Sequence, residues 1–149
     1  FSRIMSLKDG TKKMSKSDLS DLSRVNLTDD KDLIINKIKK AKTDPLPLPN
    51  SLKELDSRPE AKNLLGIYSS LINFTLEQSI NEFSGKNFSE FKEKLSQVLV
   101  EKIDKISNEI KKLNNDKKYL DQILLDGQKK ANDISSNKLK KMQEIIGFL

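Results

Sequence analysis

The sequence of 149 residues contains no cysteine and no histidine. Without cysteine the chain can form no disulfide and offers no thiolate for catalysis. Without histidine it lacks the usual general base, the usual imidazole metal ligand and any Ser-His triad. Its chemistry must therefore rest on lysines, hydroxyls, carboxylates and backbone groups, a set suited to electrostatic stabilisation of phosphate chemistry.

Glycine, proline and long apolar runs are also scarce. The chain has five glycines and four prolines, and no apolar run approaches the ~20 residues that a membrane helix needs. Its first residues lack the order of charged, apolar and small residues that marks a signal peptide. With 35% hydrophobic and 34% charged residues, the composition predicts a soluble, mainly helical protein that can bury a core.

Basic residues are abundant, and the formal net charge is +6. Such a charge favours a polyanionic partner. Only Arg3, Arg24 and Arg58 of the 28 basic residues are arginines. The remaining lysines, together with many asparagines and isoleucines, fit the amino-acid bias of an AT-rich genome. The charge alone is therefore weak evidence for nucleic-acid binding.

The most specific string is Lys13-Met14-Ser15-Lys16-Ser17, which follows a turn at residues 9–11. It places two ammonium groups three residues apart between hydroxyls. Lysine ammonium groups are strongly hydrated donors, and their charge-assisted bonds to phosphate are strong. The alternative is a lysine- and serine-rich surface loop, but the position after an expected strand favours a loop that grips the phosphates of a nucleotide.

The first part of the chain predicts a strand, a loop and a connector. Residues 3–7 form a short, mostly apolar run, which predicts a buried strand. The polar residues 8–26 show no period and predict a loop with one helical turn near 19–22. Alternating prolines at 45, 47 and 49 exclude a helix and favour an extended connector whose leucines pack on the body over a peptide ligand for an aromatic groove.

The remaining segments predict helices. Residues 28–30 can cap a first helix, Pro59 suits the first turn of a second, and residues 75–78 form a capping-box pattern. The longest apolar periodicity favours a bundle over a coiled coil. The expected helices cover residues 28–41, 59–73, 75–85, 88–113 and 117–145, the last in one or two pieces. We therefore expect a mainly α fold, in which a helical bundle follows one strand and a loop.

The chain resembles the C-terminal part of bacterial-type tryptophanyl-tRNA synthetases, which are class I enzymes, over nearly its whole length. The KMSKS string alone indicates only class I. Two further stretches carry the resemblance to the tryptophan family: Arg58-Pro59-Glu60 with Asn63-Leu64-Leu65 and Ile67-Tyr68, and Tyr119-Leu120-Asp121 with Gly127 and Lys130-Ala131. The proline run at 45–49 departs from the short polar stretch expected there.

This resemblance implies an activity and a set of site residues. The family uses ATP with Mg²⁺ to convert L-tryptophan to tryptophanyl-adenylate and pyrophosphate, and then transfers the amino acid to its tRNA. By resemblance, Lys13 and Lys16 are catalytic and hold the β- and γ-phosphates. Ser15 and Ser17 add hydroxyl and backbone donors. The ATP site would also include Ile4 and Met14, lying against the adenosine, and no metal ligand is expected in this chain.

The resemblance also implies a domain organisation. Residues 1–27 would end a Rossmann-type α/β catalytic domain, 28–115 would form a helical domain that binds the tRNA anticodon region, and 116–149 would be a C-terminal helical segment packing back on the catalytic domain. The implied partners are tryptophan, ATP and the tryptophan-accepting tRNA. The full enzyme is expected to be a cytoplasmic homodimer with no membrane contact.

The chain begins without methionine on what reads as a core strand, so we expect a segment of a longer protein. The HIGH motif and the tryptophan pocket of the family are not in it. The segment by itself is therefore predicted to be inactive.

Two other readings stay open. One is the tyrosyl enzyme, or another class I synthetase that shares the KMSKS string. The other is a non-enzymatic helical module that binds RNA or another partner and carries the string by coincidence. The expected strand at 3–7 argues against such a module, because a single strand of this kind has no sheet to join.

Overall fold

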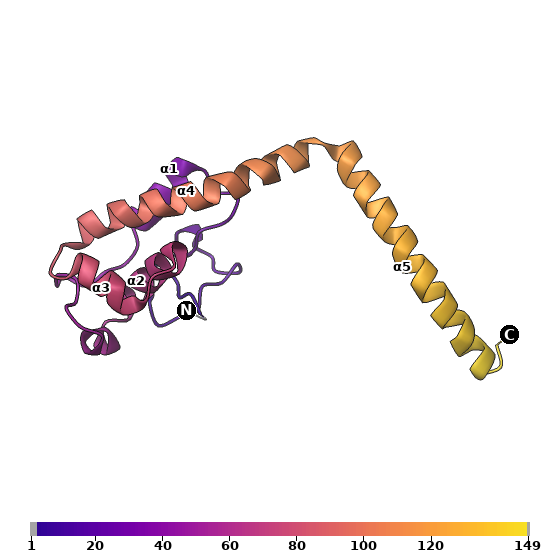
Figure 1. The fold of residues 1–149 in the computed structure, drawn as a ribbon, viewed down its shortest axis with the longest axis horizontal. Helices are drawn as coiled ribbons and strands as arrows, with labels where there is room; N and C mark the ends of the chain where they lie inside the picture. The colour runs from indigo at the N-terminus through magenta and orange to yellow at the C-terminus, as the bar shows by residue number, and fades with distance from the viewer. Residues whose placement is uncertain (1–2, 149) are drawn as a thin grey trace. The chain divides into compact units, whose positions relative to one another are not determined.

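The computed structural model describes residues 3–148, and this part of the chain is mainly helical, as expected (Figure 1). Two short 3-10 helices, η1 and η2, accompany the α-helices. The elements in chain order are η1 (Asp21–Ser23), α1 (Lys31–Lys39), η2 (Lys53–Ser57), α2 (Pro59–Ile72), α3 (Leu76–Phe83), α4 (Phe88–Asn115) and α5 (Lys117–Ile145). No helix among residues 3–148 is long and apolar enough to cross a membrane.

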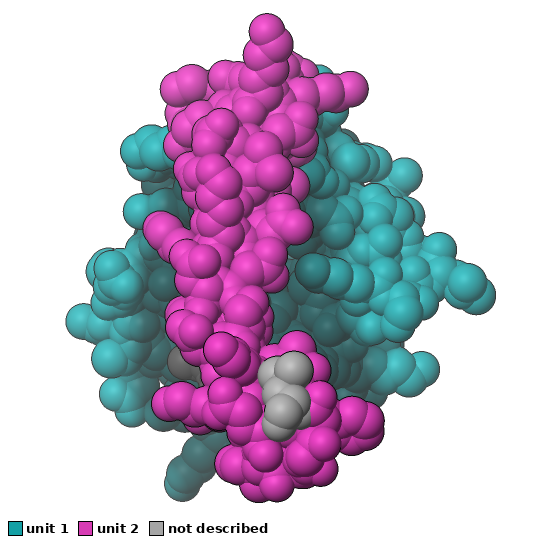
Figure 2. Space-filling model, turned by 90° about the vertical axis from the view of Figure 1, so that its right-hand side faces the viewer, with its two compact units in different colours: residues 1–108 teal, residues 109–149 magenta. Residues whose placement is uncertain are grey.

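The chain divides into two compact units, residues 1–108 and 109–149 (Figure 2). The boundary falls inside α4, after Asn108. The first unit holds helices α1 to α3 and most of α4, whereas the second holds the end of α4 and all of α5.

The core of the first unit includes an aromatic cluster where α2, α3 and α4 meet. The ring of Tyr68 packs edge-on against Phe83 and Phe91, with centroid distances of 5.0 and 5.8 Å, and Phe83 and Phe91 are 4.9 Å apart. Such edge-to-face pairs add to the free energy gained from burying the rings. Burial of Tyr68 and its hydrogen bonds to Glu82 raise the pKa of its hydroxyl to about 12.

The helix starts follow from local chemistry. The carboxylate of Asp30 accepts the backbone N–H of Leu33 and caps α1, and Thr75 and Gln78 complete the capping box of α3. Pro59 occupies the first turn of α2, where its missing N–H costs no hydrogen bond. Helix α2 ends at Ile72, and the next residue, Asn73, adopts the left-handed conformation typical of a C-terminal cap.

The predicted strand at residues 3–7 is wrong for the described chain. Residues 3–148 contain no strand, and this segment forms only an isolated antiparallel bridge between Met5 and Lys13. Leu7 is buried as expected, but Ile4 is 44% exposed. A strand needs a neighbouring strand on which to continue its ladder, and residues 3–148 supply no such neighbour.

The connector at residues 45–49 forms no helix, as its prolines require, but it bends at residues 45–46, and only part of it packs. Leu48 is buried and pairs with the segment after α3, donating its N–H to the carbonyl of Lys86 at 2.8 Å. Leu46 is 57% exposed, which contradicts the expectation that both leucines pack.

In the second unit, α5 is one continuous helix rather than two pieces. Asp116 caps it by accepting the N–H of Tyr119 at 3.0 Å. None of its described residues is buried. Its apolar side chains are therefore open to a partner.

Candidate functional site

The KMSKS string lies on one arm of a hairpin-like loop. Ser6 donates its N–H to the carbonyl of Lys12 at 2.8 Å, and Met14 donates to the carbonyl of Ile4 at 3.1 Å. At the turn, the carboxylate of Asp9 accepts the hydroxyl and the N–H of Thr11 at 2.6 and 3.0 Å. These two hydrogen bonds hold the pKa of Asp9 below its usual value.

The turn presses against the start of α2 at Gly10. A Cβ at this position would lie 2.5 Å from the carbonyl carbon of Pro59, so only glycine fits. The neighbouring Glu60 is paired with Lys42 at 2.8 Å, and this pair holds the pKa of Glu60 below its usual value. Lys42 in turn donates its backbone N–H to the carbonyl of Leu7 at 2.7 Å.

Helix α2 also holds the other arm of the loop. The side-chain amide of Asn63 accepts the N–H of Met5 and donates to its carbonyl, both at 2.8 Å. Asn63 is buried. Its amide therefore replaces the strand neighbour that the bridge of Met5 with Lys13 lacks on its other side.

The five residues of the string are mostly exposed, and Met14 is partly buried. The hydroxyls of Ser15 and Ser17 lie 2.9 Å apart, and Ser15 accepts the N–H of Ser17 at 3.3 Å. Within residues 3–148, no carboxylate pairs with Lys13 or Lys16. Both ammonium groups are thus available to an anion from outside the chain.

A hollow of about 930 Å³ opens beside the string. Five of the six site residues predicted from the sequence line it, namely Ile4, Lys13, Met14, Ser15 and Lys16. Ser17 is not among the lining residues and contacts the site through Ser15. The rest of the lining consists of Arg3, Arg24, Val25, Asn26, Leu27 and Thr28.

The lining is cationic, with two lysines, two arginines and no carboxylate among its described residues. Arg24 is paired with Asp21 outside the lining, whereas Lys13 and Lys16 have no carboxylate partner among the described residues, and cations of this kind can stabilise phosphate oxygens. Residues 24–28 form a wall of this hollow that was not predicted from the sequence. They lie in a segment without periodicity, and only the fold brings them to the string.

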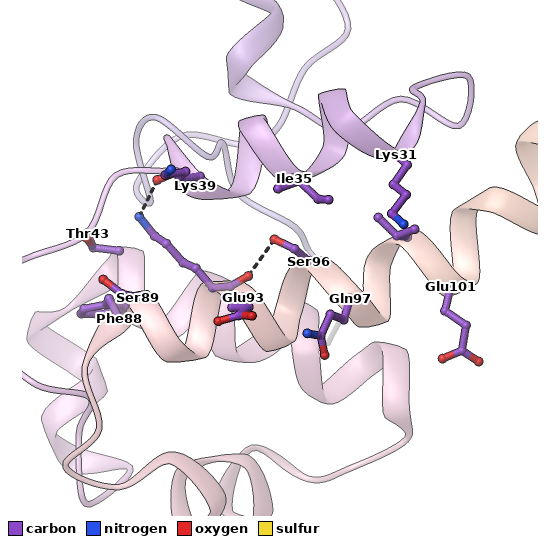
Figure 3. Close-up of a pocket in the computed structure, with 12 residues that line it drawn as sticks. Lys31, Ile35, Lys39, Thr43, Phe88, Ser89, Glu93, Ser96, Gln97 and Glu101 are labelled. Carbon is purple, nitrogen blue, oxygen red and sulfur yellow. Dashed lines mark hydrogen bonds between the residues drawn. The ribbon is translucent and has the colours of Figure 1, made fainter.

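A second hollow, of about 850 Å³, lies between α1 and α4 (Figure 3). Lys92 crosses its end and donates to the carbonyls of Ala41 at 2.6 Å and Lys39 at 3.2 Å. Burial lowers the pKa of this amine. Lys92 therefore caps the C-terminus of α1, and its role is explained by the fold.

The structure also places two other stretches noted in the sequence, one around Arg58 and one from Tyr119 to Ala131. Arg58 makes two hydrogen bonds to the carboxylate of Asp44, at 2.6 and 3.0 Å, and lies over the ring of Phe88. Its side chain does not cap α2. The stretch from Tyr119 to Ala131 lies on α5 and contributes no buried side chain. Across residues 3–148, no group of three or more acidic side chains is placed to hold a metal ion.

The family model described as "tRNA synthetases class I (W and Y)" matches residues 1–129. The chain therefore belongs to this family of class I synthetases. The match includes the hairpin-like loop, the cationic hollow and most of the helical part. It confirms the class recognised from the KMSKS string.

Within that family the chain is similar to tryptophan–tRNA ligases. It is 50% identical over 147 residues to the enzyme of Mesorhizobium japonicum, covering 99% of this chain and 41% of the relative. The enzyme of Rickettsia felis is 49% identical over 147 residues, which is 44% of its length. The chain thus spans about two fifths of the curated relatives it matches.

A solved structure agrees. The crystal structure of tryptophanyl-tRNA synthetase from Mycoplasma pneumoniae superposes with a TM-score of 0.72 at 26% identity, over 97% of this chain and 43% of that one. Together these similarities confirm the resemblance to the tryptophan family that the sequence motifs indicated.

Proposed function

We propose that this chain is the C-terminal segment of a tryptophan–tRNA ligase and that its cationic hollow binds the phosphates of ATP. One observation carries the proposal: the KMSKS lysines line a hollow whose described lining includes two further cationic side chains and no carboxylate. The names of the relatives at about 50% identity favour tryptophan as the amino acid.

The proposed reaction begins with attack of the tryptophan carboxylate on the α-phosphorus of ATP. The bond to the bridging oxygen breaks, and negative charge develops on the departing pyrophosphate. Lys13 and Lys16 would hold the β- and γ-phosphates where this charge develops, which lowers the barrier because the cations are already in place. Ser15 and Ser17 would donate further hydrogen bonds.

Ile4 and Met14 would lie against the adenosine, with their backbone groups facing it. The Mg²⁺ ion would arrive with ATP as part of the substrate complex. The residues that hold tryptophan would come from the part of the relatives that this chain does not match. We therefore expect no activity from the chain by itself.

We also propose roles for the helical parts. Residues 28–115 would bind the anticodon region of the tRNA, with their lysines contacting phosphates. Residues 116–149 would pack back on the catalytic domain, as the unburied apolar side chains of α5 suggest. The full enzyme would act as a homodimer.

The experiment is ATP–pyrophosphate exchange by the full-length parent, with tryptophan and tyrosine in parallel. Exchange that requires tryptophan is the expected result. Exchange with tyrosine alone would assign the chain to the sister enzyme, whose family shares the matching model. Absence of exchange with either amino acid would contradict the proposal and favour an RNA-binding module.

A further inference from the structure

The wall of the cationic hollow is attached to α1 through a buried lysine. The side chain of Lys37 is 0% exposed, and its ammonium nitrogen lies 2.6 Å from a carboxylate oxygen of Asp29 and 2.6 Å from one of Asp21. A buried ammonium group is costly unless it is paired and hydrogen-bonded. The two carboxylates therefore fix Lys37 in one place.

Asp29 and Asp21 in turn hold the wall. Asp29 accepts the backbone N–H of Asn26 at 2.8 Å, and the side-chain amide of Asn26 donates to Asp29 and to Asp21, both at 3.1 Å. The Lys37 bonds hold the pKa of Asp21 below its usual value, with a further contribution from Asn26. The carboxylate of Asp21 is thus kept as an acceptor.

The same contacts continue to the end of the KMSKS string. The other carboxylate oxygen of Asp21 lies 3.0 Å from Arg24, and Arg24 donates to the backbone carbonyl of Asp18 at 3.1 Å. Asp18 directly follows Ser17. Lys37, Asp21 and Arg24, which we name the Lys37 network, therefore connect the interior of α1 to the backbone two residues after Lys16.

The string has few other attachments on this side. Among the described residues, the segment after Met14 makes hydrogen bonds mainly to itself, between Ser15 and Ser17 and from the N–H of Asp18 to the carbonyl of Ser15 at 3.5 Å. The N–H of Ser20 also donates to the carboxylate of Asp18, at 2.8 Å, so the bond from Arg24 to Asp18 is one of two contacts that hold this residue and is the one that joins it to the wall. A change in this link would displace Lys16.

We propose that Lys37, acting through Asp21 and Arg24, is a positioning residue that fixes Lys16 for the reaction. This inference rests on the proposed function of the hollow. Charge stabilisation depends on donors that are held in place before the reaction, and a displacement of about 1 Å can lower a rate by about 100-fold.

The test uses Asp21→Asn in the full-length parent, assayed by ATP–pyrophosphate exchange. Asp21 is suitable because its side chain is half exposed and Lys37 keeps Asp29 as a partner. We expect kcat to fall about tenfold or more while KM for tryptophan stays unchanged. Asp21→Glu, which keeps the charge, should recover most of the activity.

The matched control is Asp44→Asn, which removes the partner of Arg58, a residue that does not touch the string. We expect its kcat to stay within about twofold of the parent. An equal fall in both variants would overturn the inference, because the loss would then follow from general weakening of the fold. If Asp21→Asn does not fold, Arg24→Gln breaks the last link of the network. Because Arg24 also lines the hollow, this variant is compared in the Lys16→Ala background, where a further loss of more than about twofold would overturn the inference.

A double variant separates positioning from stability. In a Lys16→Ala background, Asp21→Asn should lower kcat by less than about twofold more, because its effect passes through Lys16. A full additional tenfold loss would overturn the inference. If the parent exchanges with tryptophan and Asp21→Asn has the same kcat as the parent, only the role of the Lys37 network is refuted. If the parent shows no exchange, the proposed function is refuted as well.

Discussion

Three neighbouring lysines of the hairpin-like loop differ in what they face. Lys12 is 79% exposed and pairs with Asp9 at 3.4 Å. Lys13 and Lys16 instead line the cationic hollow, and no carboxylate among residues 3–148 pairs with them. Lysine therefore pairs with a neighbouring carboxylate at position 12, whereas at positions 13 and 16 it faces a hollow that can hold an anion.

The first prediction concerns Lys16. In the full-length parent, Lys16→Ala should lower the rate constant of adenylate formation roughly 10²–10³-fold, because the cation that meets the developing charge is lost. Lys12→Ala is the control, and it should stay within about twofold. A Lys16→Ala enzyme that binds ATP more weakly but reacts at the parent rate would contradict a transition-state role.

A second prediction concerns Gly10. Gly10→Ala would place a methyl group 2.5 Å from the backbone of Pro59. Because that neighbour is backbone and cannot rotate away, the loop must shift. We expect a lower kcat for tryptophan activation and a lower melting temperature in the full-length parent. Unchanged values of both would show that the loop moves without cost and that α2 does not set its position.

Helix α5 differs from the other α-helices because none of its described side chains is buried within its own unit. Its apolar residues form a stripe on one helix face, at steps of one, three or four residues from Leu120 to Ile134 and again at Met142 and Ile145, with Lys138 between the two parts. The stripe consists of Leu120, Ile123, Leu124, Gly127, Ala131, Ile134, Met142 and Ile145. Ile134 and Ile145 are 76% and 84% exposed.

A third prediction tests whether the catalytic domain covers this stripe. Leu124 lies on the stripe, whereas Leu125 is turned by about 100° around the helix. They are 69% and 50% exposed in this chain. In the full-length parent, Leu124→Gln should destabilise the fold by about 1–3 kcal/mol, the usual gain from burying a leucine.

Leu125→Gln is the matched control, and we expect it to change the free energy of unfolding by less than about 0.5 kcal/mol. Thermal or denaturant unfolding measures both variants. Equal effects of the two substitutions would mean that the stripe has no covering partner in the parent.

For the whole molecule, the chain spans about two fifths of its curated relatives, and this limits what it can do. The fourth prediction is that residues 1–149 show no ATP–pyrophosphate exchange but bind the tryptophan-accepting tRNA. Binding should weaken linearly on a log–log plot against salt concentration, as expected for lysines that contact phosphates.

A matched control is a lysine-to-glutamine variant of the helical surface, which should reduce the slope of that plot. Binding that does not respond to salt would contradict a phosphate-contacting surface. Exchange activity by the chain alone would contradict the proposal that the residues holding tryptophan lie outside it.

Local sequence was enough to predict much of the fold. The cap at Asp30, the proline at the start of α2 and the capping box at Thr75 each act within one helical turn, so their effect is visible in consecutive residues. The same holds for the KMSKS string, whose residue types identified the synthetase class that the family match bears out.

The tertiary structure alone decided how the site is built. Asn63 meets Met5 across 58 positions of sequence, Gly10 meets Pro59, and Lys37 binds both Asp21 and Asp29. No period or short motif marks such pairs, because they depend on which buried helix faces pack together. The predicted strand failed for the same reason. An extended segment becomes a strand only beside another strand. Here Met5 is bonded to the side-chain amide of a helix residue on one side and forms a single bridge on the other.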